Sequence, residues 1–424
     1  MSAVFILVVL IVLLLTGLPI AFVLGGFGII LLLLNDLNLV MVPQALFGAV
    51  DNFILLAAPL FILMSNVLLK GGVGRDLFAA VQTWVGHWPG GLAVATIVSC
   101  AIFAAISGSS VATAATIGVV AIPEMINRGY QPNFVYGLLA AGGTLGILIP
   151  PSIPMIVYGV VTEESIVHLF VAGVGPGLLL AGGFIVFSIL YAKYSGAFTP
   201  VPKAEWPERV RTTLRATPTF VLAAIIILGI YLGIFTPTEA AGIGLTCSLI
   251  LTVLLLRTVG WKEIREAVME SMQTTVTLLL IVAGAKVFGK AITLYRVPYD
   301  VSILISENID NGAVFIVVVC FVLLIMGFFL ESLSMLLIMV PVLHPSLGVL
   351  GIDPIWFGIM FVIMIECALI TPPVGLNLFV IQAVAKTGLG DVVRGVWPFI
   401  IILLASIVAI YLVPDIALYL PFKF

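Results

Sequence analysis

Charged side chains are scarce in this chain of 424 residues. Lys, Arg, Asp and Glu together make up 9% of the sequence, whereas hydrophobic residues make up 62% and the mean hydropathy is +1.32. This composition excludes an ordinary soluble domain and is typical of a protein that lies in a lipid bilayer. At about 20 residues per spanning helix, the chain has room for roughly a dozen crossings. The formal net charge of −3 points to no acidic or basic partner, and we expect no nucleic-acid binding.

Histidine and cysteine are also scarce, which limits the available enzyme chemistry. The three histidines are scattered, and the four cysteines lie in apolar runs without paired spacing, so neither a zinc site nor a disulfide framework is expected. No His-Glu-x-x-His or nucleotide-binding pattern is present. An intramembrane hydrolase using Gly108-Ser109-Ser110 is disfavoured, because no histidine lies mid-span to activate the serine. We therefore expect no enzyme, and an ion gradient rather than ATP as the energy source.

Two polar stretches interrupt apolar sequence that would otherwise cross a bilayer. Ser107-Gly108-Ser109-Ser110 is poor helix material, because hydroxyls compete for backbone partners and glycine adds conformational freedom. Pro150-Pro151-Ser152 removes two backbone donors and prevents a continuous helix. Such backbone survives at membrane depth only where it is buried in protein or lines a cavity. Broken helices are typical of ion and substrate sites in secondary transporters.

Both interruptions recur about 220 residues later, which indicates an internal repeat. Thr371-Pro372-Pro373 matches the first Pro-Pro pair, and at the same offset Glu331-Ser332 matches Ser109-Ser110. The predicted fold is an all-α polytopic membrane protein of the elevator-type ion-transporter architecture, an inverted repeat with two re-entrant hairpins and two Pro-Pro broken helices.

The expected parts follow from this repeat. In chain order they are repeat 1 at 1–191, with scaffold helices, an inner hairpin at about 90–127 and a broken helix at 133–161; a cytoplasmic linker at 192–218; and repeat 2 at 219–424, with scaffold helices, an outer hairpin at about 313–345, a broken helix at 354–385 and a last helix at 396–412. The first apolar run, Ala3–Leu34, is too long for a signal peptide, so we expect one retained helix. We expect Trp261–Glu270 to be a surface helix ahead of a separate span at Thr274–Leu294.

The basic residues predict an orientation. With the N-terminus in the cytoplasm and each hairpin returning to its own side, most of the 17 Lys and Arg residues fall on the cytoplasmic side, as the positive-inside rule requires. The same path makes the first hairpin enter from the cytoplasm and the second from outside. The inverted relation of the repeats is thus obtained without being assumed.

The hairpin tips and the Pro-Pro breaks are the predicted binding sites, because their hydroxyl and carbonyl oxygens suit Na⁺. The expected Na⁺ ligands are Ser107, Ser109, Ser110 and Gly146 in the first repeat, and Glu331, Ser332, Thr371 and Gly375 in the second. The expected ligands of the solute, which would lie between the tips, are Ser110, Thr113, Ser152, Glu331 and Asn377.

Alternative interpretations exist for several of these residues. Serines and threonines in spans also serve helix packing, whereas a carboxylate such as Glu331 is costly there and indicates function. Lys286 and Lys290, one helical turn apart, either snorkel or pair with Glu331.

Four motifs, in order, resemble the large membrane subunit of TRAP transporters, the tripartite ATP-independent periplasmic systems of bacteria. They are Ser107–Gly118 with Pro123-Glu124-Met125, Gly146–Ile153, Thr236–Ala241 and Thr371–Gly375, and the likeness covers essentially the whole chain. Family members often carry Asp where this chain has Glu331.

The resemblance implies a multi-pass subunit of the bacterial inner membrane that works with a small four-helix membrane subunit and a periplasmic substrate-binding protein. It also implies Na⁺-coupled uptake of an organic anion by an elevator motion, with two or more Na⁺ as coupling ions. The solute is expected to be of the sialic-acid or C4-dicarboxylate type, with a lean toward sialic acid. A stand-alone ion-coupled carboxylate transporter is the alternative function.

Overall fold

The computed structural model describes residues 3–35, 38–196, 202–309 and 311–423. Their regular structure is helical throughout, and nine helical segments among them are long and apolar enough to cross a membrane. The all-α polytopic fold is therefore confirmed.

The helices of the first half are α1 (Ala3–Leu15), α2 (Ile20–Leu34), α3 (Met41–Val50), η1 (Phe53–Leu56), α4 (Ala57–Lys70), α5 (Val73–Val85), α6 (Gly91–Ser107), α7 (Ser110–Asn127), α8 (Pro132–Leu148), α9 (Ile153–Thr162) and α10 (Ile166–Ser195). Those of the second half are α11 (Trp206–Tyr231), α12 (Pro237–Leu249), η2 (Ile250–Leu255), α13 (Trp261–Leu294), α14 (Val297–Asn308), α15 (Gly312–Met326), α16 (Ser332–Val349), α17 (Pro354–Ile370), α18 (Leu376–Ala385), α19 (Leu389–Leu412) and α20 (Asp415–Lys423).

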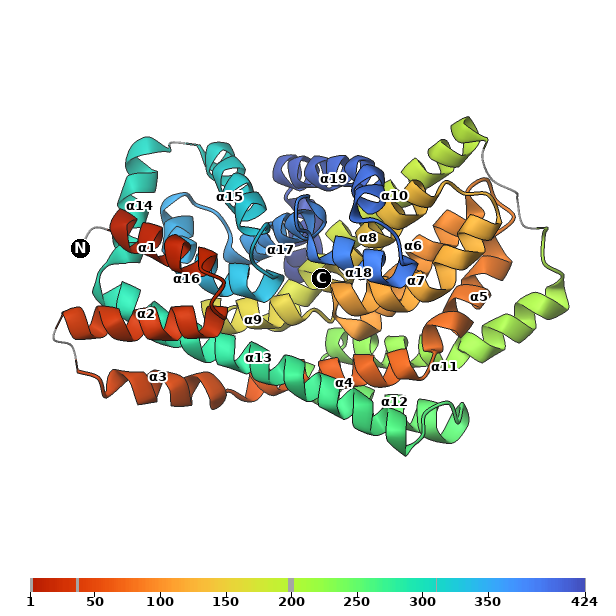
Figure 1. Ribbon diagram of the computed structural model, residues 1–424, viewed down its shortest axis with the longest axis horizontal. Coiled ribbons are helices and arrows are strands. Elements are labelled where there is room, and N and C mark those ends of the chain that lie inside the picture. The colour runs from red at the N-terminus through yellow and green to blue at the C-terminus, as the bar shows by residue number, and fades with distance from the viewer. Residues whose placement is uncertain (1–2, 36–37, 197–201, 310, 424) are drawn as a thin grey trace.

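The helices form two groups. In Figure 1, α2, α3, α4, α12 and α13 run along the lower side of the view, and α13 packs against α2, α3 and α4 while α12 packs against α4. We call these five helices the framework. Above them lie the interrupted helices α6, α7, α8, α9, α16, α17 and α18, which we call the block.

Each half of the block carries one interruption by a Pro-Pro pair, between α8 and α9 and between α17 and α18. Pro150-Pro151 and Pro372-Pro373 are both cis. α18 packs against α7 and α8, and α9 packs against α16, so the second part of each broken helix lies against the hairpin of the other half. This exchange joins the two halves into one unit.

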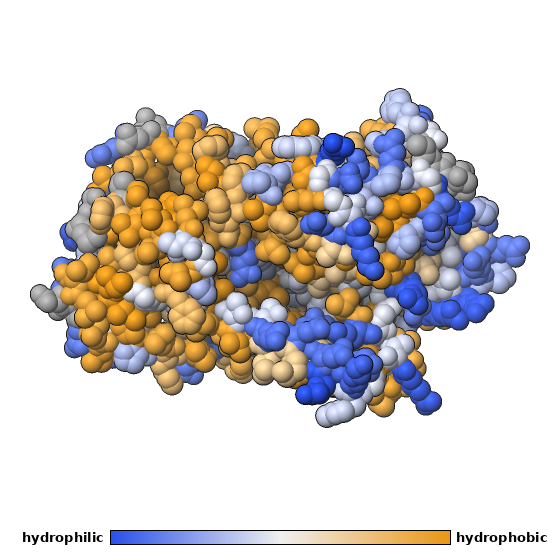
Figure 2. Space-filling model, viewed as in Figure 1, coloured by the Kyte–Doolittle hydropathy of each residue, from blue (hydrophilic) through white to orange (hydrophobic). Residues whose placement is uncertain are grey.

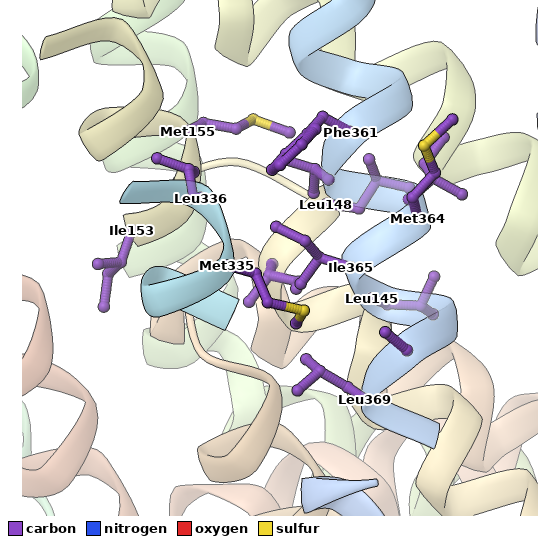
Figure 3. Packing of buried hydrophobic residues seen from close by; sticks show 14 of the residues in the cluster. Leu145, Leu148, Ile153, Met155, Met335, Leu336, Phe361, Met364, Ile365 and Leu369 are labelled. Atoms are coloured by element: carbon purple, nitrogen blue, oxygen red, sulfur yellow. The ribbon is translucent and has the colours of Figure 1, made fainter. Parts of the chain in front are cut away.

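A shared hydrophobic core holds the block together (Figure 3). Met155 of α9, Leu148 of α8, Met335 of α16 and Phe361 of α17 are fully buried and lie around one centre. Because lipid tails are as apolar as these side chains, close packing between the helices stabilises such a core in a bilayer. The methionine-rich start of α16 is therefore core.

The first apolar run differs from its expected form. It contains two helices, because Gly17 adopts a left-handed backbone (φ +79°) and Pro19 caps the start of α2. Figure 1 shows α1 folded back on α2, with the N-terminus and the end of α2 at the same side of the molecule. At 1.5 Å per residue, the 13 residues of α1 reach about 20 Å, less than the bilayer core. The expected single helix over Ala3–Leu34 was wrong.

α13 differs in the opposite sense. The expected surface helix Trp261–Glu270 and the expected span Thr274–Leu294 form one continuous helix of 34 residues. Its first turn is closed by Glu263, whose carboxylate accepts a hydrogen bond from the amide of Gly260 at 2.9 Å. Neither proline nor glycine occurs between Trp261 and Ala283, so nothing breaks the helix.

The expected linker at 192–218 is mostly helical. α10 continues to Ser195 and α11 begins at Trp206; positions 197–201 lie outside the described residues. The start of α11 packs on α5. There the ring of Trp84 contacts that of Trp206, and Trp84 Nε1 donates a hydrogen bond to Thr213 Oγ1 at 3.0 Å. Aromatic side chains therefore hold the start of α11 against α5, within the segment that was predicted as a linker.

The second hairpin is more open than expected. α15 packs against α17, whereas α16 packs chiefly against α14 and α9. α14 was not predicted from the sequence, and it packs beside α16. The expected last helix at 396–412 is α19, which begins earlier, at Leu389, and a short further helix, α20, follows it.

Candidate functional site

A cavity of about 320 Å³ lies where the two hairpin tips approach the framework. Ser109 and Ser110 of the first tip and Glu331 and Ser332 of the second all line it. The framework contributes polar residues to the opposite wall, which are Ser65, Asn66 and Thr274. Two segments separated by more than 200 residues thus meet at one cavity, as the internal repeat predicted.

The first tip is held by its own hydroxyls. Ser109 caps α7, since its Oγ accepts a hydrogen bond from Ala112 N at 3.4 Å. Thr113 Oγ1 donates to Ser109 O at 2.8 Å and lies 2.9 Å from Ser107 Oγ. Ser107 and Thr113 are fully buried, so their hydroxyls shape the tip rather than line the cavity.

Two glycines allow this tip to lie directly against the first Pro-Pro break. A Cβ at Gly146 would stand 2.4 Å from Ser109 O, and one at Gly108 would stand 2.7 Å from Pro151 O. Gly108 also has φ +61°, a conformation that favours glycine. The expected grouping of the serine cluster with Gly146 and Pro150 is therefore present in the structure.

Asn377 links the second break to the first tip. Its Nδ2 donates to Ser110 Oγ at 2.6 Å and to Ala140 O at 3.2 Å, and the side chain is fully buried. Its Oδ1 is buried without a hydrogen-bond partner. A buried oxygen without a donor is costly, so this atom is available to a cation or a donor group.

Ser152 does not reach the cavity wall. It caps α9, where its Oγ accepts from Met155 N at 3.3 Å and donates to Ile147 O, and it is fully buried. The hydroxyls of Ser152 and Thr113 both donate hydrogen bonds to backbone carbonyls. Of the expected solute ligands, only Ser110 and Glu331 line the cavity. Asn377 lies directly behind Ser110.

The second tip is less enclosed than the first. Glu331 and Ser332 are partly buried, and Glu331 stands at the start of α16 without capping it. Thr371 Oγ1 donates to Cys367 O at 2.6 Å, and Gly375 has φ +55°. These two residues are near the cavity but not on its wall, to which the second break contributes Leu369 and Leu376. The second expected set is therefore only partly assembled.

Pairing of Lys286 or Lys290 with Glu331, one of the two interpretations drawn from the sequence, does not occur among the described residues. Among the ion pairs of the described residues, Lys70 with Glu266 and Glu270 links α4 to α13, and Arg128 with Glu124 lies within one helix end. Both Lys286 and Lys290 line a different cavity, farther along α13.

The framework side of the cavity was not foreseen. Asn66 Nδ2 donates to Ser271 Oγ at 2.8 Å, which fixes α4 against α13, and Ser65 Oγ is buried without a partner. A lone asparagine within the apolar run Phe53–Leu69 was the available signal.

The chemistry of this cavity is that of oxygen donors. In the part of the chain that the structure describes, no three His, Cys, Asp or Glu side chains group as metal ligands. Serine hydroxyls and one carboxylate line it, and these groups suit a small hard cation and a polar solute.

Comparison with known proteins gives the family. The model of the tripartite ATP-independent periplasmic transporter, DctM component, matches residues 7–416. The chain belongs to this family. It is thus a transporter large permease and not an enzyme, and the resemblance drawn from its motifs is confirmed.

Curated relatives of the permease have different named solutes. A C4-dicarboxylate TRAP large permease of Pseudomonas aeruginosa is 40% identical over 89% of this chain and 88% of its own. The C4-dicarboxylate permease of Rhodobacter capsulatus is 36% identical over 99% of both chains. The sialic acid permease of Vibrio cholerae is 34% identical over 96% of both.

A solved structure has the same fold. The YdaH transporter of Alcanivorax borkumensis matches with a TM-score of 0.65 over 98% of both chains, at 15% sequence identity. Membership of the TRAP family generally implies a periplasmic binding protein and a small membrane subunit as partners, and a multi-pass location in the membrane.

Proposed function

We propose that the permease takes up an organic anion in symport with Na⁺, by alternating access of the cavity between its hairpin tips. The observation that carries this proposal is the meeting of Ser109-Ser110 and Glu331-Ser332 at one cavity between block and framework. A cavity at such a boundary changes its access when one group moves against the other.

The proposed Na⁺ sites lie at the two tips. At the first, Ser107, Ser109 and Ser110 lie against Gly146 and the cis Pro150-Pro151 break, where backbone carbonyls gather. At the second, Glu331 and Ser332 would be joined by carbonyls near Thr371 and Gly375 after a small closure. An ion bound between a hairpin and a break would hold the two together.

Charge gives a reason for coupling. Glu331 lines the cavity in which the anionic solute would bind, and two anions in a site of low dielectric repel each other. A Na⁺ at Glu331 removes this repulsion, so solute and ion favour each other's binding. Ser110 and Asn377 would hold the solute's carboxylate at the other tip.

Two ions are energetically sufficient. At about 150 mV and a tenfold gradient, each Na⁺ that enters releases about 5 kcal/mol, whereas importing a monoanion against the potential costs about 3.5 kcal/mol. Two ions therefore leave about 6 kcal/mol, which supports accumulation of about 10⁴-fold. One ion would support only about tenfold.

We further propose an elevator motion in which the block slides along the framework. The block has its own buried core (Figure 3), and α13 offers a continuous straight surface. The interrupted helices would carry the site, while the unbroken helices stay in place.

The proposed orientation places the polar end of the molecule in the cytoplasm. Hydrophilic residues gather on the right-hand half of Figure 2, where α5, the start of α11 and the α12–α13 connection lie. Lys70, Lys262 and Arg265 are at this end, as the positive-inside rule requires. Because α1 and α2 form a hairpin and not a single crossing, the N-terminus would then lie outside, opposite to the expectation from sequence.

The proposed partners are a small four-helix membrane subunit and a periplasmic binding protein that delivers the solute. The identities to C4-dicarboxylate and sialic acid permeases are similar, so we propose an organic anion without choosing between them. If the permease needs its partners, proteoliposomes that contain this chain alone will not import solute. Robust import by the chain alone would instead support a stand-alone carboxylate transporter.

The test is uptake by the reconstituted three-protein system under imposed Na⁺ gradients. Ser109→Ala and Thr371→Ala should each raise the Na⁺ concentration for half-maximal uptake about tenfold, the effect of losing about 1.4 kcal/mol of ion binding. Ser165→Ala is the matched control, because Ser165 also caps a helix but lies at the exposed start of α10. Wild-type Na⁺ dependence in the Ser109→Ala/Thr371→Ala double variant would show that these hydroxyls only serve packing.

A further inference from the structure

A second and larger cavity lies farther along α13, with a volume of about 620 Å³. Its walls come from α3 and α13 of the framework and from α9 and α16 of the block. Like the first cavity, it thus lies at the boundary between the two groups of helices.

One inclined stripe of α13 connects the two cavities. Thr274 and Leu278 line the first, and Val282, Lys286 and Lys290 line the second. Each is four residues after the one before, so the five form a stripe that winds around the helix by about 40° at each step. At 1.5 Å per residue, Lys286 lies about 12 Å beyond Leu278 along the axis.

The charge changes sign along this stripe. Glu331 is the ionisable residue of the first cavity, whereas the second has Lys286, Lys290 and Glu163, a formal net charge of +1. Both lysines are exposed to the cavity, and within the described residues neither makes an ion pair. Two like charges one turn apart destabilise a helix, so their presence without a partner needs a cause.

From this geometry we infer that the second cavity is an anion-binding vestibule, in which Lys286 and Lys290 hold the carboxylate or sulfonate of the solute before it enters the site between the tips. This inference rests on the proposed function for the identity of the anion. In the proposed orientation the vestibule opens outside, where the binding protein releases its solute. Lysines in a hollow with apolar walls focus the field and raise the local concentration of anions.

The charge of the vestibule is testable without transport. The permease, purified with its small subunit in nanodiscs of zwitterionic lipid, would carry Gln44→Cys on the vestibule wall in a background with the four native cysteines replaced by alanine. The probes are a sulfonate-bearing and a trimethylammonium-bearing methanethiosulfonate. The modification ratio is the reaction rate of the sulfonate probe divided by that of the trimethylammonium probe. It should fall at least about tenfold when Lys286→Gln and Lys290→Gln are added.

Two controls keep this measurement specific. Ala115→Cys lies on the wall of the first cavity, and there the ratio should not respond to the lysine substitutions. Lys286→Arg/Lys290→Arg should keep the wild-type ratio, because the charge is kept. If the double glutamine variant does not fold, each single substitution should give part of the change. An unchanged ratio in the glutamine variants would overturn the inference.

The role in transport is tested by uptake in the three-protein system. In Lys286→Gln/Lys290→Gln, the concentration of loaded binding protein for half-maximal uptake should rise at least about fivefold, while the Na⁺ concentration for half-maximal uptake stays the same. High concentrations of choline chloride should remove the difference, since salt screens the attraction. Lys262→Gln, at the start of the same helix, is the matched control.

The two proposals fail in distinguishable ways. Wild-type protein without Na⁺-dependent uptake would refute the proposed function and leave the modification ratio as a test of the vestibule's charge. A ratio that falls while uptake is unchanged would refute the solute's passage through the vestibule and leave Na⁺ symport intact. Anionic lipid can also be added to the nanodiscs. If it lowers the modification ratio of the wild-type lysines to that of the glutamine variants, the lysines bind lipid phosphate, and the inference is overturned.

Discussion

At the scale of single residues, the hydrogen bond between Asn377 and Ser110 joins the two repeats. It connects the second break to the first hairpin tip, and both side chains are buried. Ser110 lines the cavity, so the bond also fixes where one wall of the site lies. A buried bond between neutral groups contributes about 1 kcal/mol to stability, and breaking it on one side alone leaves a polar group unpaired.

A double-mutant cycle measures this bond. Asn377→Ala and Ser110→Ala should each destabilise the permease, and their coupling in the free energy of unfolding should be about 1 kcal/mol. The measurement is unfolding by sodium dodecyl sulfate in mixed micelles. Asn377→Ala combined with Ser165→Ala is the control, and these two should be additive. Additivity of the first pair would mean that the bond does not contribute.

Glu331 is the second residue with a testable role. Glu331→Gln keeps the size of the side chain and removes its charge, so it should raise the half-maximal Na⁺ concentration for uptake about tenfold, which corresponds to about 1.4 kcal/mol. Glu331→Asp keeps the charge and should stay within about threefold of wild type. Glu208→Gln, on the exposed start of α11, provides the control. Equal Na⁺ dependence of Glu331→Gln and wild type would exclude Glu331 from the ion site.

At the scale of helices, the approach of α8 to the first hairpin tip depends on the absence of a side chain. A Cβ at position 146, which every residue other than glycine has, would collide with Ser109 O. Because that neighbour is backbone, it cannot turn aside as a flexible side chain would. The serine hydroxyls and the Pro-Pro break can share one site only while this contact stays close.

Gly146→Ala should therefore separate the tip from the break. We expect a loss of about 1–3 kcal/mol in the free energy of unfolding, the usual cost of overpacking, and at least about tenfold slower uptake. Gly182→Ala in α10 is the matched control, since nothing lies within 4 Å of its added Cβ. That change should be neutral or stabilise by up to about 1 kcal/mol, because alanine favours helix. Thermal melting in detergent compares the two.

At the scale of the whole molecule, the block with its own core lies against the framework. Both cavities lie along their boundary, and both are lined by residues of α13. The proposed motion of the block would therefore close one cavity and open the other.

Cross-linking block to framework should stop transport. Ile62→Cys of α4 and Ala112→Cys of α7 both line the first cavity, and a bifunctional thiol reagent that joins them should abolish uptake until it is reduced. Phe27→Cys with Phe288→Cys is the control, because it joins α2 to α13 within the framework, where the two rings are 6.1 Å apart. Full-rate uptake after complete cross-linking of the first pair would refute the moving block.

The sequence by itself determined the class of the protein and the position of its interruptions. A chain with so few charges must lie in a bilayer, and serine clusters or Pro-Pro pairs cannot continue a spanning helix, wherever the rest of the chain lies. These are local effects of side chain and backbone, which is why Ser109, Ser110, Glu331 and Asn377 could be predicted as candidate ligands from the sequence alone.

Only the tertiary structure decided which of these residues face the cavity. Ser152 and Thr113 have the same hydroxyl chemistry as Ser110, but their hydroxyls donate to the backbone carbonyls of Ile147 and Ser109, and neither residue lines the cavity. The sequence could not show that Lys286 and Lys290 line a different cavity from Glu331. Their distance from Glu331 depends on the position of the block along α13, which is a matter of tertiary packing. The fold of α1 against α2 was likewise decided by packing, since an apolar run of this length allows either one crossing or a hairpin.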